Sequence, residues 1–171
     1  VDVLLGPEMK STGEVMGIGK SFGEAYFKAQ RAAGVILPKT GNVFLSVRDK
    51  DKSAICSIAK DLIDIGFNLY ATRGTQKYLE EKNIGCNKVN KVKEGQPHIV
   101  DMIKNGEVHL IINTTEGARS IKDSFSIRKE ANNNNVCLTT TISGAKAFCK
   151  AILFIDNFDA TDIQSRHDTI N

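Results

Sequence analysis

Hydroxyl, amide and lysine side chains follow the apolar runs in the middle of the chain, and these groups could bind an anion. A threonine-rich segment follows the run at 67–71, Lys91 follows 87–90, and Asn113 closes 109–113. The candidate binding residues are Lys52, Thr72, Thr75, Lys91, Asn113, Thr114, Thr115 and Thr140. Their donors, together with the free N–H groups and partial positive charge of helix N-termini, favour a phosphate group as ligand.

Each of these residues taken alone also has a structural explanation. Thr75 suits the N-cap of a helix, since its hydroxyl can accept a backbone N–H. Lys91 fits an ordinary solvated loop, and Asn113 can close an Asx turn. The phosphate hypothesis therefore depends on these residues meeting at one edge of one sheet.

The elements that would position these residues alternate regularly between strands and helices. Apolar runs predict strands at 43–47, 67–71, 87–90, 109–113 and 136–140. Helical spacing or start signals predict helices at 51–65, 75–82, 97–105, 120–133 and 143–154. This order predicts an α/β fold with a five-stranded, parallel, doubly wound sheet of Rossmann type, with helices on both faces. Ligands of such sheets bind at the carboxyl ends of the strands.

The two ends of the chain differ from this alternating region. Residues 1–34 predict a short strand followed by a helix, which opens with the capping-box pattern Ser21 to Glu24. Residues 35–41 are expected to form a linker, 42–155 the α/β domain, and 156–171 a loose polar tail without helical periodicity. Because the chain starts at Val1 with no leader pattern, we expect it to be a piece of a longer protein.

Composition excludes several classes of protein. The 171 residues are 41% hydrophobic and 25% charged, which is typical of a globular domain. A net charge of +3 gives no indication of a nucleic-acid partner, and the absence of a long apolar run argues against a membrane span. The four cysteines have no metal-ligand spacing, so we expect buried, reduced thiols and no metal site.

The sequence gives little support for catalysis. His98, His109 and His167 have no neighbouring serine or cysteine nucleophile with an orienting acid, so structural roles are expected for His98 and His109. Neither a P-loop nor a dinucleotide-binding glycine motif is present, and residues 16–20 (MGIGK) have the wrong spacing for either. No catalytic residue is predicted.

Several motifs in this order resemble the C-terminal end of the carbamoyl-phosphate synthase large chain. Residues 5–17 (LGPEMKSTGEVMG) are similar to the end of that family's second ATP-grasp unit. Residues 41–155 resemble its allosteric domain, which has the methylglyoxal-synthase-like fold. The supporting motifs are 45–48 (LSVR), 66–75 (GFNLYATRGT), 89–92 (VNKV) and 111–115 (IINTT).

The resemblance implies a regulatory domain that binds a nucleotide monophosphate, UMP or IMP. The family's phosphate and ribose contacts fall on Lys52, Thr72, Thr75, Lys91, Asn113 and Thr115, with Thr114 as a neighbour. Arg73, within the 66–75 motif, adds either a phosphate donor or a clash. Some members carry Tyr-Asp-Thr near an ornithine site; Leu138-Thr139-Thr140 stands here, so only Thr140 matches and ornithine regulation is in doubt.

The resemblance also implies the setting of the domain. The complete enzyme would be a cytoplasmic, bacterial-type, homo-oligomeric ligase with a glutamine amidotransferase small chain. It would use ATP with Mg or Mn to make carbamoyl phosphate from bicarbonate and glutamine-derived ammonia, for pyrimidine and arginine synthesis. The fragment itself is expected to be non-catalytic and to need no cofactor.

Two alternatives remain at this stage. The first is a methylglyoxal synthase, which would act on dihydroxyacetone phosphate. The resemblance implies that such an enzyme has an Asp base in the loop after the fourth strand. That loop here reads Asn113-Thr-Thr-Glu-Gly117, with Glu116 as its one acid. The second is a docking or oligomerisation domain with no ligand.

Overall fold

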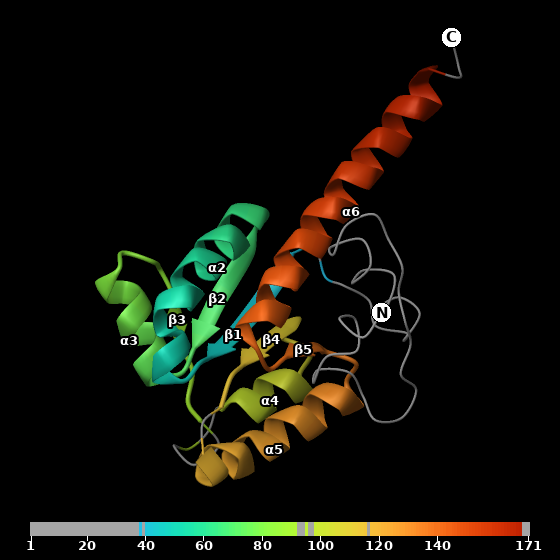
Figure 1. Ribbon diagram of the computed structural model, residues 1–171. Helices are drawn as coiled ribbons and strands as arrows, with labels where there is room; N and C mark the ends of the chain where they lie inside the picture. Colours follow the sequence, from blue (N-terminus) through green and yellow to red (C-terminus); the bar gives the residue numbers. More distant parts are fainter. Residues whose placement is uncertain (1–37, 39, 92–94, 96–97, 116, 169–171) are drawn as a thin grey trace, which may run out of the picture. The chain divides into compact units, whose positions relative to one another are not determined.

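The computed structural model describes residues 38, 40–91, 95, 98–115 and 117–168 (Figure 1). By spatial clustering, Pro38–Lys146 forms one compact unit, and Val1–Leu37 with Ala147–Asn171 forms the other. The expected strand and helix within residues 1–34, and most of the expected linker, lie outside the described residues.

The predicted five-stranded parallel sheet is confirmed. Its strands are β1 (Gly41–Ser46), β2 (Phe67–Ala71), β3 (Asn87–Lys88), β4 (Leu110–Asn113) and β5 (Cys137–Thr139). Their order in the sheet is β3-β2-β1-β4-β5, and every pair is parallel. The chain therefore winds outward from β1 in both directions. The place between β1 and β4 is the switch point where ligands of doubly wound sheets bind.

Four helices connect successive strands, and a fifth follows the last strand. They are α2 (Lys52–Ile65), which follows the 3-10 turn η2 (Asp49–Asp51), α3 (Arg73–Glu81), α4 (Ile99–Lys104), α5 (Gly117–Asn133) and α6 (Ile142–Asp168). Each predicted helix of the α/β region is present; the ends of the first four differ from the prediction by a few residues, whereas α6 extends well beyond residue 154. Gly66 ends α2 at φ +119°, and its N–H is bonded to the carbonyls of Leu62 and Ile63.

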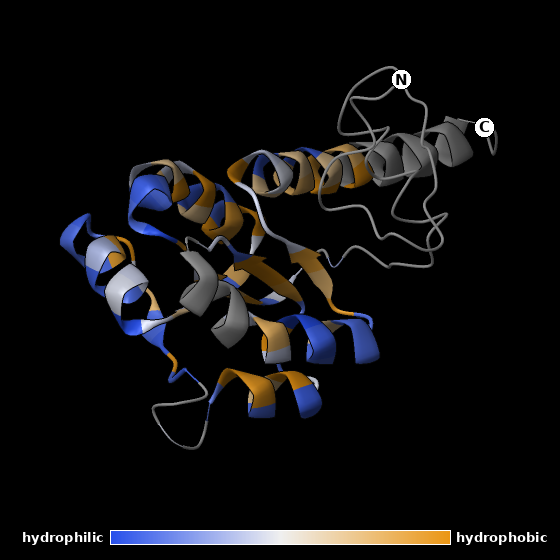
Figure 2. Cartoon of the chain, turned by 60° about the horizontal axis from the view of Figure 1, so that its bottom comes forward, coloured by the Kyte–Doolittle hydropathy of each residue, from blue (hydrophilic) through white to orange (hydrophobic). Residues whose placement is uncertain are grey.

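The two faces of the sheet are buried under different helices. Val43 and Leu45 alternate with Phe44 along β1, and all three are fully buried, as expected for a central parallel strand. On the Phe44 side, residues of the strands, α4 and α5 form one apolar cluster; its members include Phe44, Ile99, Ile103, Ile111 and Ile127. The strands are correspondingly apolar in Figure 2.

The expectation for residues 156–171 is wrong in one respect. Helix α6 continues through this segment to Asp168, where an irregular tail was predicted. No glycine or proline lies between Ala145 and Asn171, so nothing in the sequence interrupts the backbone hydrogen bonds of the helix. The missing apolar periodicity signals the loss of a buried stripe and does not by itself end a helix.

The four cysteines are free thiols, as predicted, although only Cys137 and Cys149 are buried; Cys56 and Cys86 are half-buried. Desolvation raises the pKa of the Cys86 thiol to about 12, with a smaller contribution from the negative charge of Glu80. In the part of the chain that the structure describes, no cluster of His, Cys, Asp and Glu could hold a metal ion. None of the described helices is long and apolar enough to cross a membrane.

Candidate functional site

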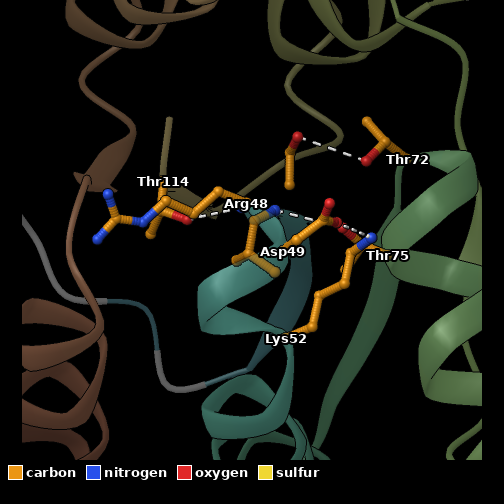
Figure 3. A network of polar contacts seen from close by, with 8 residues as sticks. Arg48, Asp49, Lys52, Thr72, Thr75 and Thr114 are labelled. Carbon is orange, nitrogen blue, oxygen red and sulfur yellow. Dashed lines mark hydrogen bonds and ion pairs between the residues drawn. The ribbon is translucent and has the colours of Figure 1, made fainter. Parts of the chain in front are cut away.

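The segment after β1 is fixed by hydroxyl groups from two other strand ends (Figure 3). The Val47 N–H donates to Thr75 Oγ1 at 3.3 Å, and the Arg48 N–H donates to Thr114 Oγ1 at 3.0 Å. The Thr114 N–H in turn donates to the carbonyl of Ser46 at 3.0 Å. The carboxyl ends of β1, β2 and β4 therefore meet, as the sequence analysis expects.

Thr75 does not cap α3. The helix begins at Arg73, and the N-cap is Thr72, whose side chain makes no capping hydrogen bond. Instead the Thr72 hydroxyl donates to Ser46 Oγ at 3.4 Å, while Thr75 holds the Val47 N–H. Thr72 caps with its backbone, since its carbonyl accepts the Gln76 N–H at 2.8 Å. The N-cap interpretation of Thr75 is therefore wrong, because a neighbouring strand end competes for its hydroxyl.

This site is buried and rich in hydrogen-bond donors. Thr72, Thr75, Asn113 and Thr114 are all buried. Asn113 Nδ2 is fully enclosed and has no hydrogen-bond partner among the described residues. Thr75 and Thr114 each use the hydroxyl oxygen as an acceptor, so their O–H protons remain available to donate. Unpartnered buried donors are rare in folded proteins, so Asn113 Nδ2 is an unused hydrogen-bond donor at the end of β4.

Lys52 contributes the positive charge of this site. Its ammonium group lies 2.7 Å from Asp49 Oδ1, and its side chain is 20% exposed. A Cβ added to Gly74 would lie 3.4 Å from Lys52 Nζ, so this group sits at the N-terminal turn of α3. The pKa of Asp49 is lowered, mainly by the hydrogen bond from Lys52 and further by its charge.

Three groups of the site were not predicted from the sequence: the Ser46 hydroxyl, the backbone N–H of Arg48, and Asp49. Asp49 and Lys52 are three residues apart, as are Arg48 and Asp51, whose side chains meet at 2.8 Å. This i,i+3 spacing of opposite charges was the available signal. The strand-end hydrogen bonds had no such signal, because they join segments far apart in the sequence.

Three further predicted residues follow β3, β4 and β5 of the sheet. Lys91 is exposed and follows Asn90, which pairs with His98 in an isolated bridge beyond β3. Thr115 and Thr140 are half-buried after β4 and β5. All three lie at the carboxyl side of the sheet, so their predicted roles as ligand contacts stay predictions.

His98 and His109 have the structural roles that the sequence predicts. His98 is the N-cap of α4, and its N–H donates to Asp101 Oδ2 at 3.1 Å. His109 Nδ1 accepts the N–H of Asn42 at 3.0 Å, joining the start of β1 to the start of β4. His109 therefore lies at the amino ends of the strands, whereas the candidate site lies at their carboxyl ends.

A doubly wound, five-stranded parallel sheet with buried hydrogen-bond donors at the carboxyl ends of its central strands defines a class of α/β domain. A family model described as "MGS-like domain" matches residues 54–140. The chain belongs to this family. The structure of methylglyoxal synthase from Elizabethkingia anophelis has the same fold, with a TM-score of 0.54 and 17% sequence identity over 67% of this chain and 80% of that one.

Two relatives that are similar in sequence are larger proteins. The carbamoyl phosphate synthase large chain of Pseudomonas putida is 53% identical over 98% of this chain and 16% of its own length. The C-terminal section of that large chain from Aquifex aeolicus is 52% identical over 89% of this chain and 28% of its own length. The chain thus spans about a sixth of the length of the first relatives, and the resemblance noted in the sequence is confirmed.

Proposed function

We propose that this chain is the effector-binding regulatory domain of a carbamoyl-phosphate synthase large chain and that it binds a nucleoside monophosphate, UMP or IMP. The observation that carries this proposal is the set of buried donors at the β1–β4 switch point, led by the unpartnered Asn113 Nδ2. A phosphate or a ribose hydroxyl supplies the acceptors that these donors lack. The high identity to carbamoyl phosphate synthase large chains supports the same assignment.

Each side chain has a role in this proposal. The first-turn amides of α3 and the ammonium of Lys52 face the phosphate, while Thr72, Thr75 and Asn113 border the same place. Lys91 supplies a second positive charge from the end of β3, and Thr114, Thr115 and Thr140 complete the rim. A charge-assisted hydrogen bond from a lysine to a dianion contributes about 1.5–3 kcal/mol.

The proposal extends to the protein in which such a domain works. There it would control a cytoplasmic, oligomeric ligase that uses ATP with Mg or Mn, and a glutamine amidotransferase small chain would supply ammonia. Ornithine would be a weak effector at best, since Leu138-Thr139-Thr140 offers few acceptors for its ammonium group. The domain itself would regulate without catalysing.

Calorimetric titration of the chain with UMP, IMP, ornithine and inorganic phosphate tests the proposal. We expect binding of at least one nucleotide, and a loss of about ten- to a hundredfold in affinity for Lys91→Ala and for Lys52→Met. Unchanged affinity of Lys91→Ala across salt concentrations would place the phosphate elsewhere. Steady release of methylglyoxal from dihydroxyacetone phosphate would instead favour an enzyme.

A pair of glycine variants tests the place of the phosphate without removing a charge. Gly74→Ala puts a methyl group 3.4 Å from Lys52 Nζ, where the phosphate would approach, whereas a Cβ at Gly85 meets nothing within 4 Å. We expect Gly74→Ala to weaken nucleotide binding with little change in stability, and Gly85→Ala to leave binding unchanged. Equal affinity of the two variants would contradict this placement.

A further inference from the structure

The ammonium group of Lys52 lies between two features of opposite sign. On one side it contacts Asp49 Oδ1 at 2.7 Å, and on the other it lies near the N-terminal turn of α3, at Gly74. A helix N-terminus carries partial positive charge, and the first turn of α3 contains no acidic residue to offset it. The Lys52 ammonium group and the N-terminus of α3 are therefore two positive features side by side. Asp49 places a negative charge next to the ammonium group.

The two members of this ion pair differ in exposure. The Lys52 side chain is 20% exposed, whereas that of Asp49 is 91% exposed and lies on the short turn η2. An exposed carboxylate can rotate into water at little cost, because it regains full hydration there. The largely buried Lys52 has less freedom, so its ammonium group stays beside α3 when Asp49 leaves.

The neighbouring pair on the same turn behaves differently. Asp51 Oδ2 accepts from Arg48 Nε at 2.8 Å, and the Asp51 side chain is 15% exposed. This carboxylate therefore belongs to Arg48, and no contact joins it to Lys52 among the described residues. Two aspartates thus lie on one turn: Asp49 pairs with Lys52 (Figure 3), and Asp51 pairs with Arg48.

We propose that Asp49 is an internal counter-ion that competes with the ligand phosphate for Lys52 and so sets the affinity of the site. The inference rests on the proposed function, since it concerns the phosphate that the proposed function places beside Lys52 and the first turn of α3. When the nucleotide binds, its phosphate accepts from Lys52 and the Asp49 carboxylate turns out to solvent. When the nucleotide leaves, Asp49 pairs with Lys52 again.

Matched variants on the same turn provide the test. The chain, Asp49→Asn and Asp51→Asn are titrated with UMP, IMP and inorganic phosphate by calorimetry, and their thermal unfolding is compared. Asp49→Asn should bind about three- to tenfold more tightly, because the competing ion pair is gone. Asp51→Asn removes the same charge without releasing Lys52, so it should change affinity by less than about twofold.

A second measurement detects directly whether Lys52 leaves Asp49 when the nucleotide binds. The Asp49 carboxyl resonance is titrated by NMR in the free chain and at saturating nucleotide. Loss of Lys52 on binding should raise the pKa of Asp49 toward its ordinary value. If the chain binds nucleotide but Asp49→Asn binds equally or more weakly, the counter-ion role is wrong and the proposed function stands. Absence of binding in all three chains overturns both.

Discussion

The Thr114 hydroxyl at the end of β4 accepts the backbone N–H of Arg48 at 3.0 Å, and this bond fixes the segment that carries Asp49 and Lys52. Thr75 holds the preceding N–H, that of Val47, at 3.3 Å. Two buried threonines from separate strand ends therefore set the path of the chain after β1. The position of the Lys52 ammonium depends on that path, so stability and binding are coupled in these residues.

Asn113→Leu should separate binding from stability. Asn113 is 2% exposed and its Nδ2 has no partner, so an apolar side chain of similar volume loses no hydrogen bond from that atom. We expect the urea midpoint to stay the same or rise, and nucleotide affinity to fall at least about tenfold. Asn42→Leu is the control, because Asn42 Nδ2 donates to the Glu107 carbonyl at 2.7 Å, and it should lower stability. A large loss of stability in Asn113→Leu would contradict a donor reserved for ligand.

Thr75→Val should destabilise the fold. The substitution leaves the Val47 N–H without its acceptor in a buried place, which costs about 1–3 kcal/mol. Thr75→Ser keeps the hydroxyl and should recover most of that loss in denaturant unfolding. Equal stability of the valine variant and the original chain would show that Val47 finds another acceptor.

Gly41→Ala should disrupt the amino ends of β1 and β4, at the end of the sheet away from the site. An added Cβ would clash with the His109 ring, and Gly41 has φ +132°, a conformation that favours glycine. We expect a loss of at least about 2 kcal/mol in unfolding free energy, from backbone strain and displacement of His109. Gly106→Ala (φ +73°, with nothing within 4 Å) carries strain alone and should cost less. Nucleotide affinity of the folded Gly41 variant should be unchanged, because the site is at the other end of the sheet.

Lys52→Met should raise the pKa of Asp49 toward its ordinary value of 3.8, because the hydrogen bond and charge that lower it are removed. A carboxyl whose pKa is lower in the folded chain stabilises the fold above its unfolded pKa. That contribution disappears as the pH falls through the folded pKa. The small stability difference between the chain and Lys52→Met should therefore be present near neutral pH and vanish in acid, measured by unfolding at each pH. A difference that grows in acid would contradict the pairing.

The sequence by itself determined the order of the elements and the family. Continuous apolar runs such as 43–47 and 109–113 predict central strands, and the residues that follow them must reach the carboxyl edge of a parallel sheet. This conclusion needs only the order of the strands and helices. Thr72, Thr75, Asn113 and Thr114 could therefore be assigned to the carboxyl ends of the strands from the sequence alone. The motifs that resemble the synthase large chain add the identity of the domain.

Tertiary structure decided which groups pair at that edge. The sequence predicts Thr75 as a helix cap and Asn113 as a turn residue, because it shows only which hydrogen-bond partners are close along the chain. In the folded chain a distant N–H, that of Val47, takes the Thr75 hydroxyl, and the Asn113 amide is enclosed without a partner. Helix α6 likewise extends to Asp168 because backbone bonding continues where the apolar stripe stops. Hydrogen-bond partners are selected by three-dimensional proximity and burial, and neither is encoded by spacing along the chain.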